Sequence, residues 1–306
     1  MTGTATPRDT GPGSDETALV LCGSGAHGAL EIGFVQALNE LGIGFGRIYG
    51  SSIGALNGAF LAGGMAPADL ASLWRTARVR HFARPNWAWL AHPQSRPGLF
   101  SLSALRRVLE RNLPARRFED LAVPLSIVTT DLLSGRACYW EVAGDIIEPL
   151  LASMSVPGIF APVILNGHPH VDGGVADNAP LGRAAERGHR RALMIECACA
   201  DPCAEPPRGL IGILGRAFEI ALARKHRSEL ALHANRIEIV RVVPELTTET
   251  GFLDLSAADA LIETGYAQTK AVLSKLPACG REHPGRPQDN DLGSPGPQGE
   301  QELRTQ

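Results

Sequence analysis

The sequence lacks the features of a membrane-spanning, exported or nucleic-acid-binding protein. It has no run of about eighteen uninterrupted apolar residues, the length that a membrane-spanning helix needs. Residues 1–16 have neither the basic start nor the apolar core of a secretory signal. The formal charge is only −3 in 306 residues, which gives no electrostatic case for nucleic acid as a partner. We therefore expect a globular protein of the cytoplasm.

Cysteine is also scarce, because six residues in a chain of this length do not suggest a disulfide scaffold. Three of them form the only cluster, C-x-C-x-x-x-C, at Cys197, Cys199 and Cys203. Structural zinc sites normally take four ligands in pairs such as C-x-x-C, and the sequence offers no second pair. We interpret these cysteines as small side chains on a buried strand and expect no metal site.

What is present is an alternation of short apolar segments and amphipathic ones. We expect strands at 18–22 and 47–49, two strands within 123–142, a hairpin within 161–174, and a buried strand at 191–199. Helical patterns lie between most of them, which predicts an α/β fold with a mainly parallel sheet covered by helices on both faces. The ordered domain is expected at 17–276, with disordered tails at 1–16 and 277–306.

The first glycine-rich loop follows the first strand. Gly23, Gly25 and Gly28 satisfy G-x-G-x-x-G, which can hold a dinucleotide or can present backbone N–H groups to an oxyanion. A dinucleotide-binding unit places an acidic residue at the end of the second strand, about twenty residues further on. Here that strand ends in Tyr49-Gly50-Ser51-Ser52, so the acid is missing and the oxyanion interpretation is favoured.

The second glycine-rich loop, "GSSIG", has the pattern G-x-S-x-G between a strand and a helix. Such a turn crowds the backbone on both sides of the serine, which favours glycine two residues before and after it. Ser52 is therefore a candidate nucleophile, and a helix N-cap is the alternative.

A serine nucleophile needs a proton acceptor. Asp172, in "HVDGGVADNAP", lies in a turn that can hold its carboxylate and leave one side open, although Asp-Gly is also a common turn. Three histidines follow plausible acidic partners, but two lie in strongly charged, solvated segments and one on a helix face. These less favoured bases are His189, His226 and His233.

Together, "GSGAHG", "GSSIG" and "DGG" resemble, in order and spacing, the signature of patatin-like phospholipases, and the resemblance extends over 18–273. It implies a three-layer α/β/α sandwich that hydrolyses acyl esters of lipids with a Ser–Asp dyad and no metal or organic cofactor. On that pattern Ser52 is the nucleophile, Asp172 is its base, and Asp177 and Asn178 support the loop. The oxyanion loop would be Gly23, Ser24, Gly25, Ala26, His27 and Gly28, the nucleophile turn Gly50, Ser51, Ile53 and Gly54, and the third motif Asp172, Gly173 and Gly174.

Two residues depart from the family's usual loop, Gly-Gly-Gly-x-Arg/Lys-Gly. Ser24 keeps its backbone N–H, so the oxyanion hole can persist. His27 replaces the basic residue and is either a weaker, pH-dependent cation that affects the binding of an anionic head group, or an exposed residue at the start of the helix.

Two segments could bring a lipid to this site. Residues 81–100, with Trp87, Trp89 and Leu90, form either a lid or interfacial patch, or internal packing. The basic amphipathic stretch 208–227 either contacts a membrane surface peripherally or packs on its own sheet. The partner is thus an acyl-ester lipid, and the oligomeric state stays open. The alternatives are an inactive patatin-fold regulatory module and, less favoured, a dinucleotide oxidoreductase.

Overall fold

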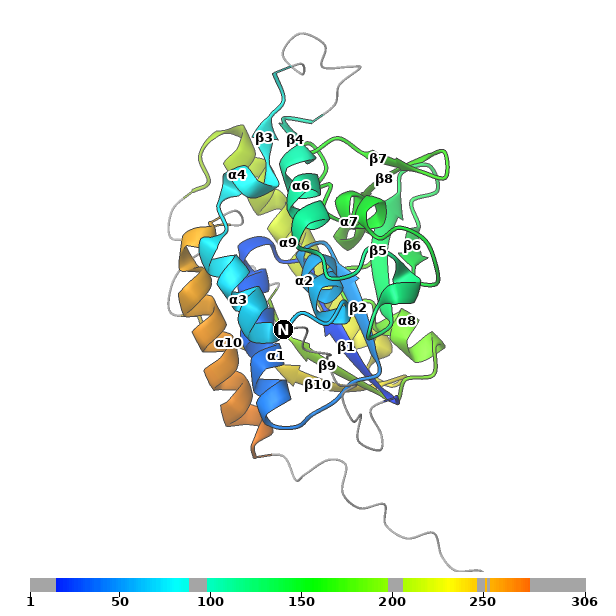
Figure 1. Cartoon of the computed structure of the whole chain (residues 1–306), viewed down its shortest axis with the longest axis vertical. Coiled ribbons are helices and arrows are strands. Elements are labelled where there is room, and N and C mark those ends of the chain that lie inside the picture. Colours follow the sequence, from blue (N-terminus) through cyan, green and yellow to red (C-terminus); the bar gives the residue numbers. More distant parts are fainter. Residues whose placement is uncertain (1–14, 88–97, 198–205, 247–250, 252–253, 276–306) are drawn as a thin grey trace, which may run out of the picture.

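A computed structural model describes residues 15–87, 98–197, 206–246, 251 and 254–275 of the chain. In this part of the chain an eight-stranded sheet has the order β10-β9-β1-β2-β5-β8-β7, with β6 paired to β5 (Figure 1). From β10 to β5 the neighbouring strands are parallel, whereas β6, β7 and β8 pair antiparallel. The strands are β1 (Thr17–Leu21), β2 (Arg47–Ser51), β5 (Leu125–Asp131), β6 (Ala137–Trp140), β7 (Val163–Leu165), β8 (His168–Asp172), β9 (Arg191–Ile195) and β10 (Glu238–Val242).

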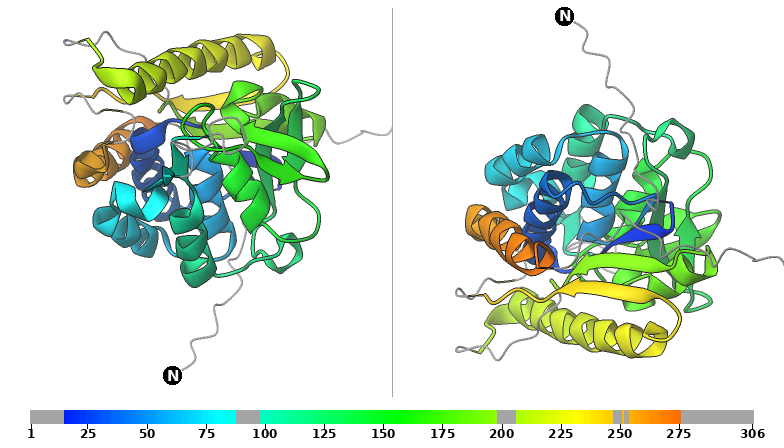
Figure 2. Two further views of the ribbon diagram at one scale, coloured as in Figure 1. Left: turned by 90° about the horizontal axis from the view of Figure 1, so that it is seen from above. Right: turned by 90° about the horizontal axis from the view of Figure 1, so that it is seen from below.

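Helices cover both faces of the sheet (Figure 2). The long helix α9 and the short α8 lie on one face, and the remaining main helices lie on the other. The mainly parallel α/β/α sandwich predicted from the sequence is therefore confirmed. The helices of the two layers are α1 (Ala29–Glu40), α2 (Ile53–Ala62), α3 (Pro67–Thr76), α6 (Ser103–Asn112), α7 (Ile147–Ser153), α8 (Leu181–Glu186), α9 (Gly209–His233) and α10 (Ala258–Leu273).

Burial explains why the sequences of the central strand β1 and of α2 are almost entirely apolar. Every residue of β1 and β5 is buried, since helices cover both faces of those strands. All ten residues of α2 are buried as well, which accounts for its almost complete lack of polar side chains. The remaining short elements are α4 (Val79–Phe82), the ladder β3 (Arg84–Pro85) with β4 (Phe100–Ser101), and the 3-10 turns η1 (Gly25–Gly28), η2 (Phe118–Asp120), η3 (Gly173–Val175) and η4 (Leu255–Ala257).

Some predicted elements have different bounds. The strand expected at 191–199 ends at Ile195, so Cys197 lies beyond it and is buried, and Cys199 and Cys203 lie outside the described residues. In the segment 81–100, Trp87 is 75% exposed, whereas Trp89 and Leu90 lie outside the described residues. Most of both predicted tails also lies outside them.

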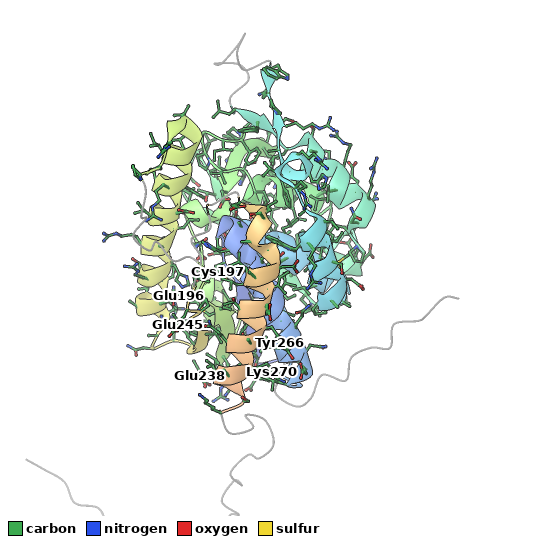
Figure 3. All side chains as sticks on the ribbon, turned by 90° about the vertical axis from the view of Figure 1, so that its left-hand side faces the viewer. Glu196, Cys197, Glu238, Glu245, Tyr266 and Lys270 are labelled. Atoms are coloured by element: carbon green, nitrogen blue, oxygen red, sulfur yellow. The ribbon has the colours of Figure 1, made fainter. Side chains whose placement is uncertain are left out.

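Helices α1 and α10 pack with their backbones in close contact. A Cβ at Gly33 would lie 1.9 Å from the carbonyl oxygen of Ile262, and a Cβ at Gly265 would lie 2.3 Å from that of Leu30. Polar contacts extend the pairing along the helices: Tyr266 and Lys270, labelled in Figure 3, both bond the carboxylate of Glu40. The two glycines therefore set the distance between the helix that follows the first loop and the last helix of the described chain.

Replacing Gly265 by alanine should destabilise the fold, because the new methyl group meets rigid backbone. We expect Gly265→Ala to lower the free energy of unfolding by about 1–3 kcal/mol, the range typical of overpacking. Urea denaturation followed by circular dichroism measures the change. Gly212→Ala is the matched control, since that helical glycine has no neighbouring atom closer than 3.8 Å to the new Cβ. Equal stability of the two variants would contradict the packing argument.

Candidate active site

Two strand ends meet on one edge of β5. Strand β2 runs parallel to β5 and ends with Ser51 opposite Val128. Strand β6 pairs with Ile127 and Val128 as well, so it lies on the other edge of β5. Strand β8 runs antiparallel and ends with Asp172 opposite Thr129. The two strands therefore approach each other along the same edge and stop at adjacent register positions. This topology brings the turn after β2 against the turn after β8, although 120 residues separate them in the sequence.

The turn after β2 holds Ser52 in a conformation that side-chain-bearing residues rarely adopt. Its φ is 53° and its ψ is −124°, which costs of the order of 1–3 kcal/mol that the surrounding fold must offset. Both flanking glycines are in tight contact: a Cβ at Gly50 would lie 2.5 Å from the Cα of Ala55, and one at Gly54 would lie 2.3 Å from the carbonyl oxygen of Leu21. The Ser52 amide donates to Ser153 Oγ at 2.8 Å.

The Ser52 hydroxyl donates a hydrogen bond of 2.5 Å to Asp172 Oδ2. The other carboxylate oxygen accepts from the Gly174 amide at 2.8 Å, which fixes the plane of the carboxylate. Asp172 is fully buried and Ser52 is 4% exposed. Burial raises the pKa of Asp172 to about 7, although both hydrogen bonds act in the opposite direction. A carboxylate with such a pKa can both accept and return a proton near neutral pH.

The first glycine-rich loop lies directly beside this pair. A Cβ at Gly23 would be 3.0 Å from Ser52 Cβ, so only a residue without a side chain fits there. Asn178 fixes the start of the loop with two hydrogen bonds: the Gly23 amide donates to Oδ1 at 2.9 Å, and Nδ2 donates to the Gly23 carbonyl at 3.1 Å. Ser24 and His27 are both buried, so the alternative of an exposed His27 is wrong: the 3-10 turn that precedes α1 faces inward.

A second group of polar side chains supports the loop from behind, and sequence reasoning missed it. Glu31 accepts from the Cys22 amide at 2.7 Å and from Asn57 Nδ2 at 2.8 Å. Asn57 also donates to the Gly28 carbonyl at 3.0 Å and accepts from Trp74 Nε1 at 2.9 Å. Burial raises the pKa of Glu31 to about 8. The available signal was a glutamate in "ALEIGFV", the otherwise apolar start of a helix.

An apolar cavity opens at the hydroxyl of Ser52. Its volume is about 80 Å³, against roughly 15 Å³ for a single water-sized probe, so it accommodates a slender chain rather than one solvent molecule. None of the described residues that line it is charged. They include Gly25 and Ala26 of the loop, and Phe82, Phe100, Ile159 and Phe160.

The three histidines considered as bases contact other residues than Ser52. His226 Nδ1 lies 3.9 Å from Cys22 Sγ, and His233 Nε2 lies 3.2 Å from Glu229. The solvated setting predicted for His226 is wrong, because that side chain is completely buried where α9 packs on the sheet. His189 packs edge-on against Tyr49. Within the described residues no group of three or more histidine, cysteine or acidic side chains is arranged to hold a metal ion.

Comparison with known proteins identifies the family. The sequence profile of the patatin-like phospholipases matches residues 19–185, more than half of the chain and all three glycine-containing motifs. The chain belongs to this family. The rest of the predicted resemblance, up to residue 273, lies outside the matched range.

Patatin-like relatives come from bacteria and mammals. An "uncharacterized NTE family protein" of Mycobacterium bovis is 32% identical over 192 residues, which cover 60% of this chain and 50% of the relative. Patatin-like phospholipase domain-containing protein 6 of Homo sapiens is 31% identical over 193 residues, covering 60% of this chain and 13% of that protein. The chain thus matches half the length of the first relative and a small part of the second. The crystal structure of VipD from Legionella pneumophila aligns with a TM-score of 0.46 at 16% identity, covering 86% of this chain and 67% of that one.

The basic amphipathic segment 208–227 is only partly buried. Leu222 and Ala223 of α9 are buried, Leu222 in an apolar cluster with Ile159 and Phe160, whereas Ala221 is exposed. The first turns of α9 nevertheless leave Leu210 and Ile213 more than half exposed. No helix in the described part of the chain combines the length and apolar character required to span a bilayer.

The buried carboxylate makes stability depend on pH. Between about pH 4 and pH 7 the folded protein retains the Asp172 proton that the unfolded chain releases, so its contribution lowers the free energy of unfolding as pH rises. Asp172→Asn removes this loss and should gain stability relative to the wild type between pH 4 and pH 8. The gain is at most roughly 4 kcal/mol, at about 1.4 kcal/mol per pKa unit.

Urea denaturation of both proteins at several pH values measures this difference. Glu31 and Asp177 are also buried carboxyls with raised pKa values, but they titrate in both proteins and cancel in the comparison. Asp69→Asn, at an exposed carboxylate on α3, is the matched control and should show no such trend. A pH-independent difference between Asp172→Asn and the wild type would contradict the assignment of a raised pKa to Asp172.

Proposed function

We propose that this protein is a serine-dependent lipid acyl hydrolase, a carboxylic ester hydrolase in which Ser52 is the nucleophile and Asp172 its direct base. The observation that carries the proposal is the 2.5 Å hydrogen bond from the Ser52 hydroxyl to a buried carboxylate, beside an apolar cavity that Ser52 lines. Family membership supports the same reaction class.

Acylation begins when Ser52 Oγ attacks the ester carbonyl and its proton passes to Asp172 Oδ2. The tetrahedral intermediate collapses, the bond to the leaving alcohol or lysolipid breaks, and Asp172 returns the proton to the departing oxygen. Asp172 then accepts a proton from water, which attacks the acyl-enzyme. Release of the fatty acid returns the proton to Ser52 and regenerates the starting pair.

The loop from Gly23 to Gly28 is the proposed oxyanion hole. Backbone N–H groups suit this task because they are fixed before the reaction and need no reorganisation as charge develops. The hydrogen bonds from Asn178 and the network of Glu31 and Asn57 support the role by fixing the loop at both ends. Ser24 replaces a glycine of the family pattern without removing a backbone donor.

The acyl chain of the substrate is proposed to enter the cavity at Ser52. Exposed apolar side chains that follow β3 or lie in the first turns of α9, Trp87, Leu210 and Ile213, are suited to peripheral contact with a lipid surface. Such contact would let one acyl chain leave the bilayer without crossing water.

Removing either member of the pair should abolish hydrolysis. We expect Ser52→Ala and Asp172→Asn each to lower kcat/KM for p-nitrophenyl butyrate and for phospholipid vesicles by at least about a thousandfold, because loss of a nucleophile or its base removes the chemical step. Ser228→Ala, at an exposed serine of α9, is the matched control and should keep full activity. A fluorophosphonate probe should label the wild type at Ser52.

An inactive patatin-fold module predicts a different result. In that case the wild type would neither hydrolyse the esters nor react with the probe. Residual hydrolysis within about tenfold of wild type in both variants would instead show that another group performs the reaction.

The pH dependence of kcat/KM tests whether Asp172 is the base. Asp172 accepts a proton only when ionised, and its pKa is raised to about 7. We therefore expect kcat/KM for an uncharged ester to rise about tenfold per pH unit below pH 7 and to level off above it. A profile that is already flat from pH 5 upward would exclude Asp172 as a base with this pKa.

A further inference from the structure

A second and larger cavity lies beside the Ser52 pocket. Its volume is about 390 Å³, and it is lined mainly by residues of α2, α3, α4 and α6. Its floor is apolar and buried, formed by side chains such as Phe60, Leu70 and Trp74. Phe82 and Leu105 line both cavities, so these two side chains separate them.

The charge of the two cavities differs sharply. Among the described residues, four arginines and no aspartate or glutamate line the larger cavity, in a chain whose formal charge is −3. None of the four forms an ion pair within the described part of the chain. Three are exposed and one, Arg107, is half-buried. The four are Arg80, Arg84, Arg107 and Arg111.

Arg107 carries a donor that lacks an acceptor. Its Nη2 is buried and has no hydrogen-bond partner among the described residues. The adjacent Arg106 differs, since it does not line the cavity and pairs with Glu148 at 2.6 Å. A buried guanidinium N–H without an acceptor is costly, and a bound anion at this position would supply one.

We propose that this cavity is a binding site for a single-chain anionic amphiphile, separate from the Ser52 pocket. The hydrocarbon tail lies on the apolar floor, and a carboxylate or phosphate head group binds Arg107 and the arginines of the rim. Planar guanidinium groups match both head groups, because two parallel N–H donors meet two acceptor oxygens. The inference rests on the cavity's own residues and does not require the proposed reaction at Ser52.

The experiment is isothermal titration calorimetry on the full chain carrying Ser52→Ala, so that no hydrolysis contributes heat. The probes share a ten-carbon chain and differ in the head group. Decanoate and decyl phosphate are used below their critical micelle concentrations, and 1-decanol below its solubility limit. Inorganic phosphate is titrated separately. The test variant is Arg107→Gln, and Arg106→Gln is its neighbour on the same helix and the matched control.

We expect one molecule of decanoate or decyl phosphate to bind per chain, and 1-decanol to bind at least about tenfold more weakly, since a hydrogen-bonded charge is lost. Arg107→Gln should weaken binding of the two anions by about tenfold or more and leave 1-decanol unchanged, whereas Arg106→Gln should change neither. The relative affinities of decanoate and decyl phosphate distinguish a carboxylate from a phosphate head group. If Arg107→Gln fails to fold, the double variant Arg80→Gln/Arg111→Gln on the exposed rim takes its place, with the same expectation.

Three results would overturn the proposal. One is equal affinity for 1-decanol and the two anions, or no binding of any probe. Another is loss of affinity in Arg106→Gln as large as in Arg107→Gln. The third is displacement of decyl phosphate by inorganic phosphate at equal concentration. That result would show that the site binds the phosphate group alone and gains no affinity from the hydrocarbon tail. Because no charged residue of the described chain lines the Ser52 pocket, dependence of binding on arginine distinguishes the two cavities. Ester hydrolysis by the wild type is measured independently.

Discussion

The structure depends on keeping a carboxylate buried within 2.5 Å of a serine hydroxyl. Burial alone would drive Asp172 toward its neutral form, and only two hydrogen bonds oppose that tendency. The hydrogen bond from Ser52 forms because two strand ends meet on one edge of β5: Ser52 follows β2, and Asp172 ends β8. The second hydrogen bond comes from the Gly174 amide in the turn after β8. Gly173 is part of the same constraint, because a Cβ there would lie 2.3 Å from the Val128 carbonyl oxygen. The motif after β8 is thus dictated by the meeting of two strands as well as by the chemistry of its aspartate.

Much of this arrangement could be predicted from the sequence, because the constraints are local. A turn that forces a residue to positive φ between a strand and a helix leaves room only for glycine at its sides, and G-x-S-x-G records that requirement. The alternation of strand and helix patterns likewise predicted a sheet covered by helices on both faces. The prediction that His226 is solvated was wrong, because it was based on the charged residues next to His226 in the sequence. The spacing of the buried residues Leu222, His226 and Glu229 along α9 does follow helical periodicity, so that signal was available.

The polar network behind the first loop could not be predicted in the same way. Glu31, Asn57 and Trp74 come from three helices, and their hydrogen bonds exist only once those helices pack. Both oxygens of the ionised Glu31 can accept, one from the Cys22 amide and one from Asn57 Nδ2. These two hydrogen bonds oppose the rise in the Glu31 pKa that burial causes. Since the same asparagine binds the Gly28 carbonyl, the loop's geometry is tied to side-chain identities in the core.

The separation of the two cavities bears on the proposed reaction. A guanidinium close to Asp172 would stabilise the carboxylate form and lower its pKa, which would weaken it as a base. In the part of the chain that the structure describes, no charged residue lines the cavity at Ser52, and the arginines line the other cavity, beyond Phe82 and Leu105. An uncharged acyl ester suits the first environment, and an anion suits the second. Two apolar side chains therefore allow one molecule to hold a cationic site beside a carboxyl group whose proposed role depends on the absence of cations.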